Sequence, residues 1–252
     1  MQNSPVLGID IGGSGIKGAP VDLTVGDFTA DRLRIPTPTK STPANVAAVV
    51  AEIVANFAAQ IGDSPVGITI PSVVTHGITR SAANIDPSWI DAPAAEIFAE
   101  RLGREVVLVN DADAAGLAEV KYGAAQGQNG IVLVTTLGTG IGSALIYRGV
   151  LVPNTELGHL EIDGFDAEKR AAASIRTAEK LSYADYVPRL QRYYETVEAL
   201  FWPDLFVVGG GVSKDADKFL PKLKLKTPIV PATLRNRAGI IGAAWLAANK
   251  LA

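Results

Sequence analysis

The sequence predicts an α/β fold built from two similar domains with a cleft between them. Short apolar runs that resemble strands alternate with helical patterns along the 252 residues, as in sheets flanked by helices. A glycine-rich turn between two strand-like runs occurs at residues 10–15 and recurs at 137–140. Repetition at about half the chain length is typical of a duplicated unit. We therefore expect two domains, each opening with a β-hairpin that faces the cleft.

In the first half of the chain, five segments carry clear patterns. Residues 6–11 and 16–21 flank the first glycine turn and predict a hairpin. Residues 44–61 place apolar side chains at three-and-four spacing, which predicts an amphipathic helix. Residues 67–70 and 106–109 are short, β-branched and apolar, as in the buried strands of a parallel sheet.

The second half repeats the pattern. A helix is expected at 112–122, a second hairpin at 131–136 and 141–146, a strand at 205–208 that runs into Gly209, Gly210 and Gly211, and a final apolar helix at 239–251. We expect a small domain formed by residues 1–110 with the C-terminal helix 239–252. A large domain would comprise residues 111–238.

Composition limits the classes of partner. The chain has 48% hydrophobic and 19% charged residues, a net charge of −3, no cysteine and two histidines. Neither nucleic acid nor a membrane is an expected partner, since no global positive charge or apolar run of membrane length is evident. Without cysteine, disulfides and thiolate zinc sites are excluded. The N-terminus lacks the pattern of a signal peptide, so a cytoplasmic location is expected.

The first glycine turn has the features of a phosphate site. Glycines at a strand turn let the backbone approach phosphate, and their amides can point together at an anion. The turn is followed by a strand, which disfavours the P-loop and the dinucleotide fingerprint because both lead into a helix. Asp10, at the end of the strand, is a candidate ligand for Mg²⁺, directly or through water. Alternatively, Asp10 only accepts hydrogen bonds from the turn amides.

Asn110 and Asp111 end a predicted buried strand and directly precede a predicted helix. Catalytic groups gather at such strand ends, where the side chain emerges into a crevice. A carboxylate there can accept the proton of an attacking hydroxyl. The alternative role of Asp111 is that of a helix N-cap. Asp113 is expected in the first helical turn, where it favours the helix dipole.

Residues 156–159 combine a carboxylate, a glycine and an imidazole. Carboxylates and imidazoles can bind paired hydroxyls as donors and acceptors. Glu156 and His159 are therefore candidates for sugar recognition. A separate basic run lies between residues 218 and 252 and contains no acidic residue. It is a candidate anion-facing surface, although a solvated face would have the same composition.

Five motifs in order give the chain a resemblance to the ROK family of bacterial sugar kinases and related repressors over nearly its whole length. They lie at residues 10–18, 110–115, 137–142, 156–159 and 209–213. The resemblance implies two ribonuclease-H-like domains of the actin and hexokinase superfamily, Mg²⁺ as cofactor, Asp111 as catalytic base and a homodimer. The implied phosphate contacts are Asp10, Gly12, Gly13, Ser14, Gly15, Lys17, Thr136, Gly138, Thr139 and Gly140. The implied sugar contacts are Asn84, Asn110, Asp111, Glu156 and His159, with the donor beside Gly209, Gly210 and Gly211.

One departure from the family pattern narrows the expectation. Most members follow the Glu-x-Gly-His stretch with a zinc-binding cysteine cluster and then a sugar-binding glutamate. Here residues 161–170 contain no cysteine and look like the same stretch of polyphosphate glucokinases and polyphosphate/ATP glucomannokinases. By that likeness Glu168 is the third sugar-binding carboxylate.

The resemblance therefore implies phosphorylation of glucose, and also of mannose, at the 6-hydroxyl with polyphosphate or ATP as donor. Two alternatives stay open. One is a kinase that uses ATP alone on another hexose. The other is a sugar-sensing regulator, which the resemblance disfavours because only nine residues precede Asp10, too few for a DNA-binding helix-turn-helix.

Overall fold

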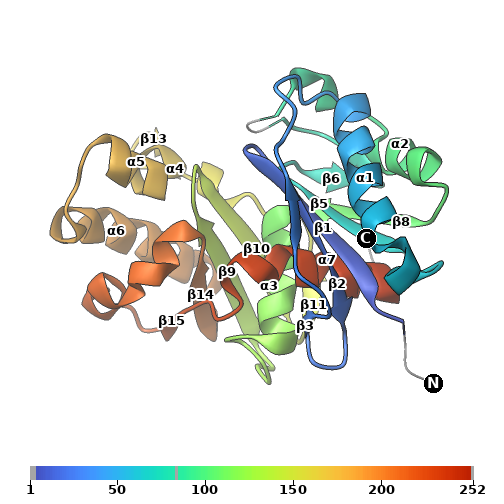
Figure 1. Ribbon diagram of the computed structural model, residues 1–252. Helices are drawn as coiled ribbons and strands as arrows, with labels where there is room; N and C mark the ends of the chain where they lie inside the picture. The colour runs from blue at the N-terminus through green and yellow to red at the C-terminus, as the bar shows by residue number, and fades with distance from the viewer. Residues whose placement is uncertain (1–3, 83–84, 251–252) are drawn as a thin grey trace. The chain divides into compact units, whose positions relative to one another are not determined.

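The computed structural model describes residues 4–82 and 85–250, which Figure 1 traces. The chain divides into two compact units: unit 1 is Met1–Ala118 with Arg237–Ala252, and unit 2 is Glu119–Asn236. The sequence placed these boundaries at 110/111 and 238/239 and took the first domain as the smaller. The structure places the first boundary inside helix α3 (Asp111–Tyr122), and unit 1 is the longer unit.

Unit 1 is built on a mixed sheet with the strand order β3-β2-β1-β5-β8, in which β4 also pairs with β2. The β1–β2 pair is antiparallel, while β1, β5 and β8 run parallel. The strands are β1 (Val6–Gly12), β2 (Gly15–Asp22), β3 (Asp27–Phe28), β4 (Leu33–Ile35), β5 (Val66–Ile70) and β8 (Val106–Asn110). A small separate hairpin is formed by β6 (Val74–Thr75) and β7 (Ile78–Thr79).

Helices cover both faces of this sheet. Leu7 and Ile9 of β1 belong to an apolar cluster with α1 (Pro43–Ile61) and α2 (Ala94–Leu102). Gly8 points to the opposite face, where it lies against the backbone of α7 (Ala238–Asn249). Because side chains alternate along a strand, α1 and α7 lie on opposite faces. The short 3-10 helix η1 (Pro87–Trp89) precedes α2.

Helix α1 has a clear start signal and a buried face. The Thr42 side chain accepts a hydrogen bond from the Asn45 amide, and Pro43 opens the helix. Among the described helices, α1 alone is long and apolar enough to cross a membrane by length and composition. Its apolar side chains from Val46 to Ile61 pack in the unit 1 core. The buried helix of a protein core can have the same length and composition as a membrane-spanning helix.

Unit 2 repeats the strand arrangement of unit 1, with the order β11-β10-β9-β14-β15. The β9–β10 and β10–β11 pairs are antiparallel, and β9, β14 and β15 run parallel. The strands are β9 (Ile131–Leu137), β10 (Ile141–Tyr147), β11 (Val150–Val152), β14 (Leu205–Gly209) and β15 (Ile229–Pro231), with a separate hairpin of β12 (Glu161–Ile162) and β13 (Phe165–Asp166). This common order supports the expected duplication.

The unit 2 sheet also has two apolar faces. Leu133, Phe206 and Val208 pack with the tyrosine-rich face of α6 (Tyr183–Phe201). Val132, Val134 and Val207 pack on the other face with Val120 of α3. The remaining helices of unit 2 are α4 (Glu168–Ala171), α5 (Ala173–Ala178), η2 (Leu157–His159), η3 (Gly211–Lys218) and η4 (Leu220–Lys222). The short η5 (Arg235–Arg237) precedes α7.

Candidate active site

The first glycine turn joins β1 and β2 through Gly13 and Ser14, with Gly12 paired to Gly15. Asp10 and Lys17 stand directly opposite in this hairpin and form an ion pair of 3.1 Å. The other Asp10 oxygen accepts a hydrogen bond of 3.0 Å from the Thr69 hydroxyl of β5. The turn thus holds a partly exposed carboxylate and an ammonium group on adjacent strands.

An arginine that the motifs did not include also lies at the first turn. Arg34 of β4 donates a hydrogen bond of 2.9 Å to the carbonyl of Ser14. Its guanidinium covers Gly15, where a Cβ atom would come within 2.7 Å of it. The parallel pairing that places Thr69 beside Asp10 and the pairing of β2 with β4 bring these side chains together from distant parts of the sequence.

The second glycine turn joins β9 to β10 through Gly138, Thr139 and Gly140. The turn is held from the start of α5, because Ser174 donates backbone and side-chain hydrogen bonds to the carbonyls of Gly138 and Thr139 at 3.0 and 2.6 Å. Thr136 pairs with Gly209 of β14. The residues of the third glycine run, Gly209 to Gly211, therefore follow a strand adjacent to the second turn.

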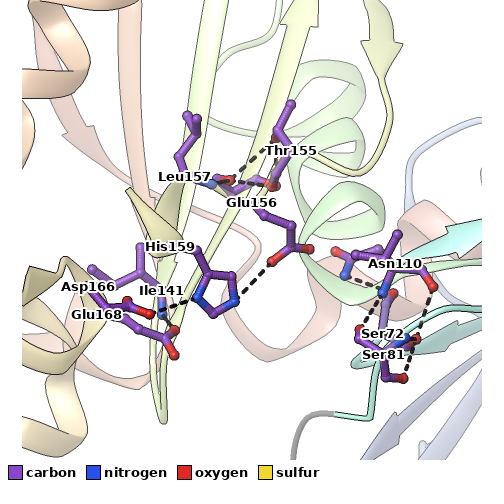
Figure 2. A network of polar contacts seen from close by, with 12 residues as sticks. Ser72, Ser81, Asn110, Ile141, Thr155, Glu156, Leu157, His159, Asp166 and Glu168 are labelled. Atoms are coloured by element: carbon purple, nitrogen blue, oxygen red, sulfur yellow. Dashed lines mark hydrogen bonds and ion pairs between the residues drawn. The ribbon is translucent and has the colours of Figure 1, made fainter. Parts of the chain in front are cut away.

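At the end of β8, the side chain of Asn110 caps helix α3. Its carbonyl oxygen accepts hydrogen bonds from the amides of Ala112 and Asp113 at 2.8 and 3.2 Å. Its amide group donates to the carbonyl of Ser72 at 3.1 Å (Figure 2). Asp111 follows in the first turn and accepts a hydrogen bond from the Ala112 amide. Helix α3 is therefore capped by Asn110, the residue that directly precedes Asp111.

Residues 156–159 form the turn of η2 against strand β10. Ser143 of β10 accepts a hydrogen bond of 3.0 Å from the Leu157 amide. A Cβ atom on Gly158 would lie 2.2 Å from the carbonyl oxygen of Ile141, so glycine alone permits this close approach. The glycine thereby fixes where Glu156 and His159 leave the backbone.

Four polar side chains gather at this place in unit 2 (Figure 2). The His159 Nδ1 atom lies 3.2 Å from Asp166, and the Nε2 atom lies 3.7 Å from Glu156. Glu168 accepts a hydrogen bond of 3.0 Å from the amide of Ile141, directly after the second glycine turn. The structure thus brings Glu156, His159 and Glu168 together, and it adds Asp166, which the sequence reasoning did not include.

The environment shifts the protonation of two of these groups. Burial raises the pKa of the Glu156 carboxyl; a charged His159 opposes this shift and Glu168 adds to it. The hydrogen bond with Asp166 raises the pKa of His159, against the effect of burial and with the help of nearby Glu168 and Glu156. Relative to the ordinary groups, the environment thus favours the neutral form of Glu156 and the charged form of His159.

The lysines after the third glycine run differ in their partners. Lys218 pairs with Asp215 at 2.6 Å, and the Lys226 ammonium lies 4.9 Å from the centre of the Trp202 ring. Lys222 and Lys224 are exposed and form no ion pair with any residue that the structure describes. Asn84, predicted to touch the sugar, lies outside the described residues.

The fold and the site together define a class of protein. Two units with one strand order, each with a glycine turn between antiparallel strands, form the actin and hexokinase-like fold of sugar kinases. The chain belongs to the ROK family, whose model matches residues 6–180.

Individual relatives extend the match beyond those residues. Polyphosphate glucokinase from Mycobacterium tuberculosis is 50% identical, over 94% of this chain and 89% of its own length. The crystal structure of inorganic polyphosphate/ATP-glucomannokinase from Arthrobacter sp. strain KM is 56% identical with a TM-score of 0.93, covering 98% of this chain and all of that one. A ROK glucokinase from Streptomyces griseus, solved with glucose and AMPPNP, shares the fold at 23% identity and a TM-score of 0.82, over 96% and 98% of the two chains.

Proposed function

We propose that this protein is a polyphosphate/ATP-dependent glucokinase that transfers a phosphoryl group to the 6-hydroxyl of glucose, and also accepts mannose. The observation that carries the proposal is the cluster of Glu156, His159 and Glu168 beside the second glycine turn. It places groups suited to a polyhydroxyl substrate next to a turn suited to phosphate. Relatives at 50% and 56% identity over almost the whole chain are named for polyphosphate-dependent phosphorylation.

Asp111 is the proposed general base. It is held at the carboxyl end of β8, in a helix whose N-cap is Asn110. Its carboxylate accepts the proton of the 6-hydroxyl as the oxygen attacks the phosphorus of the donor, and the bond to the leaving phosphate breaks. Phosphoryl transfer needs mainly positioning and neutralisation of charge, so one oriented carboxylate suffices for the proton.

The proposed sugar contacts are Glu156, His159 and Glu168, with Asn110 and Asn84. Charged carboxylates accept from sugar hydroxyls, and the imidazole donates or accepts according to its protonation. Asn110 uses its carbonyl oxygen as a helix cap and one donor on Ser72, so the second N–H of its amide group is the one proposed to donate to the sugar.

The two glycine turns are proposed to hold the donor phosphates. Backbone amides at Gly12 to Gly15 and at Gly138 to Gly140 would receive phosphate oxygens, with Lys17 adding positive charge. The residues at Asp10 fit Mg²⁺, because this carboxylate is partly exposed and each of its oxygens retains lone-pair capacity beyond Thr69 and Lys17. A bound Mg²⁺ would neutralise charge on the donor phosphates.

The donor is proposed to extend past Gly209 to Gly211. A polyphosphate chain is longer than the two turns can hold and requires further positive charge. The exposed Lys222 and Lys224 follow this glycine run in sequence and have no acidic partner among the described residues. ATP would share the phosphate turns without needing these lysines.

A direct assay tests the proposal. Purified protein is incubated with Mg²⁺ and either polyphosphate or ATP, together with glucose, mannose, galactose or N-acetylmannosamine, and sugar phosphate is measured by coupled oxidation and by ³¹P NMR. Glucose 6-phosphate formation from both donors is the expected result. Turnover of another hexose in place of glucose would overturn the glucose assignment, and absence of turnover with polyphosphate would overturn the donor assignment.

A cytoplasmic homodimer is the remaining part of the proposal, and it derives from the family resemblance. Light scattering of the purified protein measures the oligomeric state, and fractionation of the native cells measures the location. A monomer by light scattering would contradict the first part, and recovery with the membrane fraction would contradict the second.

A further inference from the structure

His159 of unit 2 lies between two carboxylates that contact different ring nitrogens. Asp166 approaches Nδ1 at 3.2 Å, whereas Glu156 is 3.7 Å from Nε2 (Figure 2). The His159 side chain is 56% exposed, while that of Asp166 is 25% exposed. Asp166, the less exposed of this pair, thus binds Nδ1. The other ring nitrogen, Nε2, lies on the side of Glu156, which is a proposed sugar contact.

Asp166 is itself fixed by a short hairpin. β12 and β13 pair Glu161 with Asp166, and the connecting Asp163 and Gly164 both have positive φ, of 54° and 77°. Such a two-residue turn with Asp-Gly is a stable hairpin connection. Arg192 of α6 binds the Asp163 carboxylate through two hydrogen bonds of 2.7 and 2.9 Å. The Asp166 backbone is therefore anchored to the body of unit 2.

The placement of Asp166 carries a cost that the fold alone does not explain. Its Oδ1 atom is buried without a hydrogen bond to any of the residues that the structure describes. A buried carboxylate oxygen without a partner is unfavourable, and an apolar side chain would avoid that cost. Within the described part of the chain, His159 is the residue whose side chain binds Asp166.

We propose that Asp166 is a positioning residue of the sugar site: its carboxylate keeps a proton on His159 Nδ1 and fixes the ring so that Nε2 meets the sugar. The effect on glucose kinetics rests on the proposed function, whereas the effect of Asp166 on the His159 ring does not. With Nδ1 protonated, neutral His159 offers Nε2 as an acceptor, and charged His159 offers an N–H donor. In both states the same atom faces the substrate.

Three carboxylates surround the imidazole, and each favours its charged form: Asp166 of β13, Glu168 of α4 and Glu156 ahead of η2. Asp166 has the largest effect because it alone is hydrogen bonded to the ring. Replacement of Asp166 by Asn keeps the size and an acceptor oxygen but removes the charge. Replacement by Ala removes both, so the pair separates charge from ring orientation.

The first test reads the ring directly and needs no substrate. Because the chain has two histidines, His76 and His159, the variant H76Q leaves one imidazole for ¹⁵N NMR titration, performed with EDTA present. In the H76Q background, we expect D166N to lower the pKa of His159. D166A should also move the neutral ring from the Nδ1–H to the Nε2–H tautomer. E161Q, which removes one charge from the same hairpin at the position opposite Asp166, is the matched control and should leave both readouts unchanged.

The second test is kinetic. Loss of the charge should raise KM for glucose by about five- to tenfold in D166N, the range for one hydrogen bond, and more in D166A. The kcat should change less than about twofold, because Asp166 does not reach the reacting hydroxyl. Circular dichroism verifies that both variants are folded.

The outcomes separate the inference from the proposed function. An unaltered His159 pKa and tautomer in both Asp166 variants, or an equal effect of E161Q, would overturn the positioning role. A fall in kcat at constant KM would overturn it as well. If the unmodified protein fails to phosphorylate glucose, the proposed function is wrong, while the NMR result still decides whether Asp166 controls the imidazole.

Discussion

The carboxylate of Glu168 accepts a hydrogen bond of 3.0 Å from the backbone amide of Ile141, the first residue after the second glycine turn. The proposed third sugar contact is therefore fixed by the same segment that is proposed to hold phosphate. A shift of the turn must move Glu168, and a ligand on Glu168 must restrain the turn. The two glycines of the turn, Gly138 and Gly140, therefore have different predicted roles, because only Gly140 lies against Glu168.

Gly140→Ala should weaken sugar binding. A Cβ atom at this position would come within 2.2 Å of the Glu168 carboxylate, so Glu168 must leave Ile141. We expect KM for glucose to rise by about fivefold or more, the cost of one charge-assisted hydrogen bond. Steady-state kinetics with glucose varied at saturating donor measures the effect, and an unchanged KM would show that Glu168 does not contact the sugar.

Gly138→Ala should instead affect the donor. No atom lies within 4 Å of a Cβ built at Gly138, and its φ is not in the left-handed region, so the folded chain tolerates a methyl group there. We expect the midpoint of thermal unfolding to stay within about 2 °C, whereas KM for polyphosphate and for ATP should rise. Unaltered KM values for both donors would place the phosphates elsewhere.

Asp111→Asn should lower kcat by about 10²-fold or more, the usual cost of losing a general base, while glucose still binds. Isothermal titration with glucose and a pre-steady-state assay measure the two quantities. Asn110→Ala is the comparison, because it removes the observed cap of α3 and should cost about 0.5–2 kcal/mol of stability. If D111N loses stability but keeps kcat within a few-fold, Asp111 is structural.

The pH dependence of kcat/KM for glucose should have two limbs from the Glu156 and His159 pair. Burial raises the pKa of Glu156, so its accepting carboxylate is lost as pH falls through that raised value. The hydrogen bond to Asp166 raises the pKa of His159, so its charge persists above the ordinary range and is lost as pH rises further. Glu156→Gln should shift the acid limb, because the ionised general base Asp111 then determines it alone, and should leave the alkaline limb in place; an acid limb that does not shift would show that Glu156 does not contribute to it.

Replacement of Lys222 and Lys224 by Gln should impair polyphosphate use more than ATP use, because many-charge contacts depend on positive surface. The matched variant replaces Lys218 and Lys226, which already have partners in Asp215 and Trp202, and should have the smaller effect. Replacement of all four lysines should have the largest. Added salt should reduce polyphosphate use in the same direction. Equal losses with both donors would identify the lysines as a solvated face.

Local patterns in the sequence predicted most of the sheet strands and the two hairpins at the glycine turns. The predicted segments 6–11, 67–70, 106–109 and 131–136 each fall within an observed strand, because continuous β-branched runs have few other stable conformations in a core. The predicted helix at 44–61 was confirmed as α1, because its buried apolar residues recur at helical spacing along its whole length.

Helix α6 was not predicted, for a physical reason. Pro188 lies inside this helix, and the buried face consists mainly of tyrosines. Both features weaken the sequence pattern that is typical of an amphipathic helix. The contact of Asp166 with His159 was also missed, since it depends on the β12–β13 hairpin. The Asp163-Gly164 pair is a hairpin signal that could have placed Asp166 opposite Glu161.

The return of the chain to unit 1 through α7 imposes an order of events during synthesis. The core of unit 1 lacks the helix that lies against Gly8 and Gly67 until Ala238–Asn249 has been made. The roughly 120 intervening residues of unit 2 take about 6–24 s to translate at ordinary rates. For that interval, while unit 2 is being synthesised, the first sheet in the nascent chain lacks helix α7. The helix that covers one face of unit 1 is thus made only after all of unit 2.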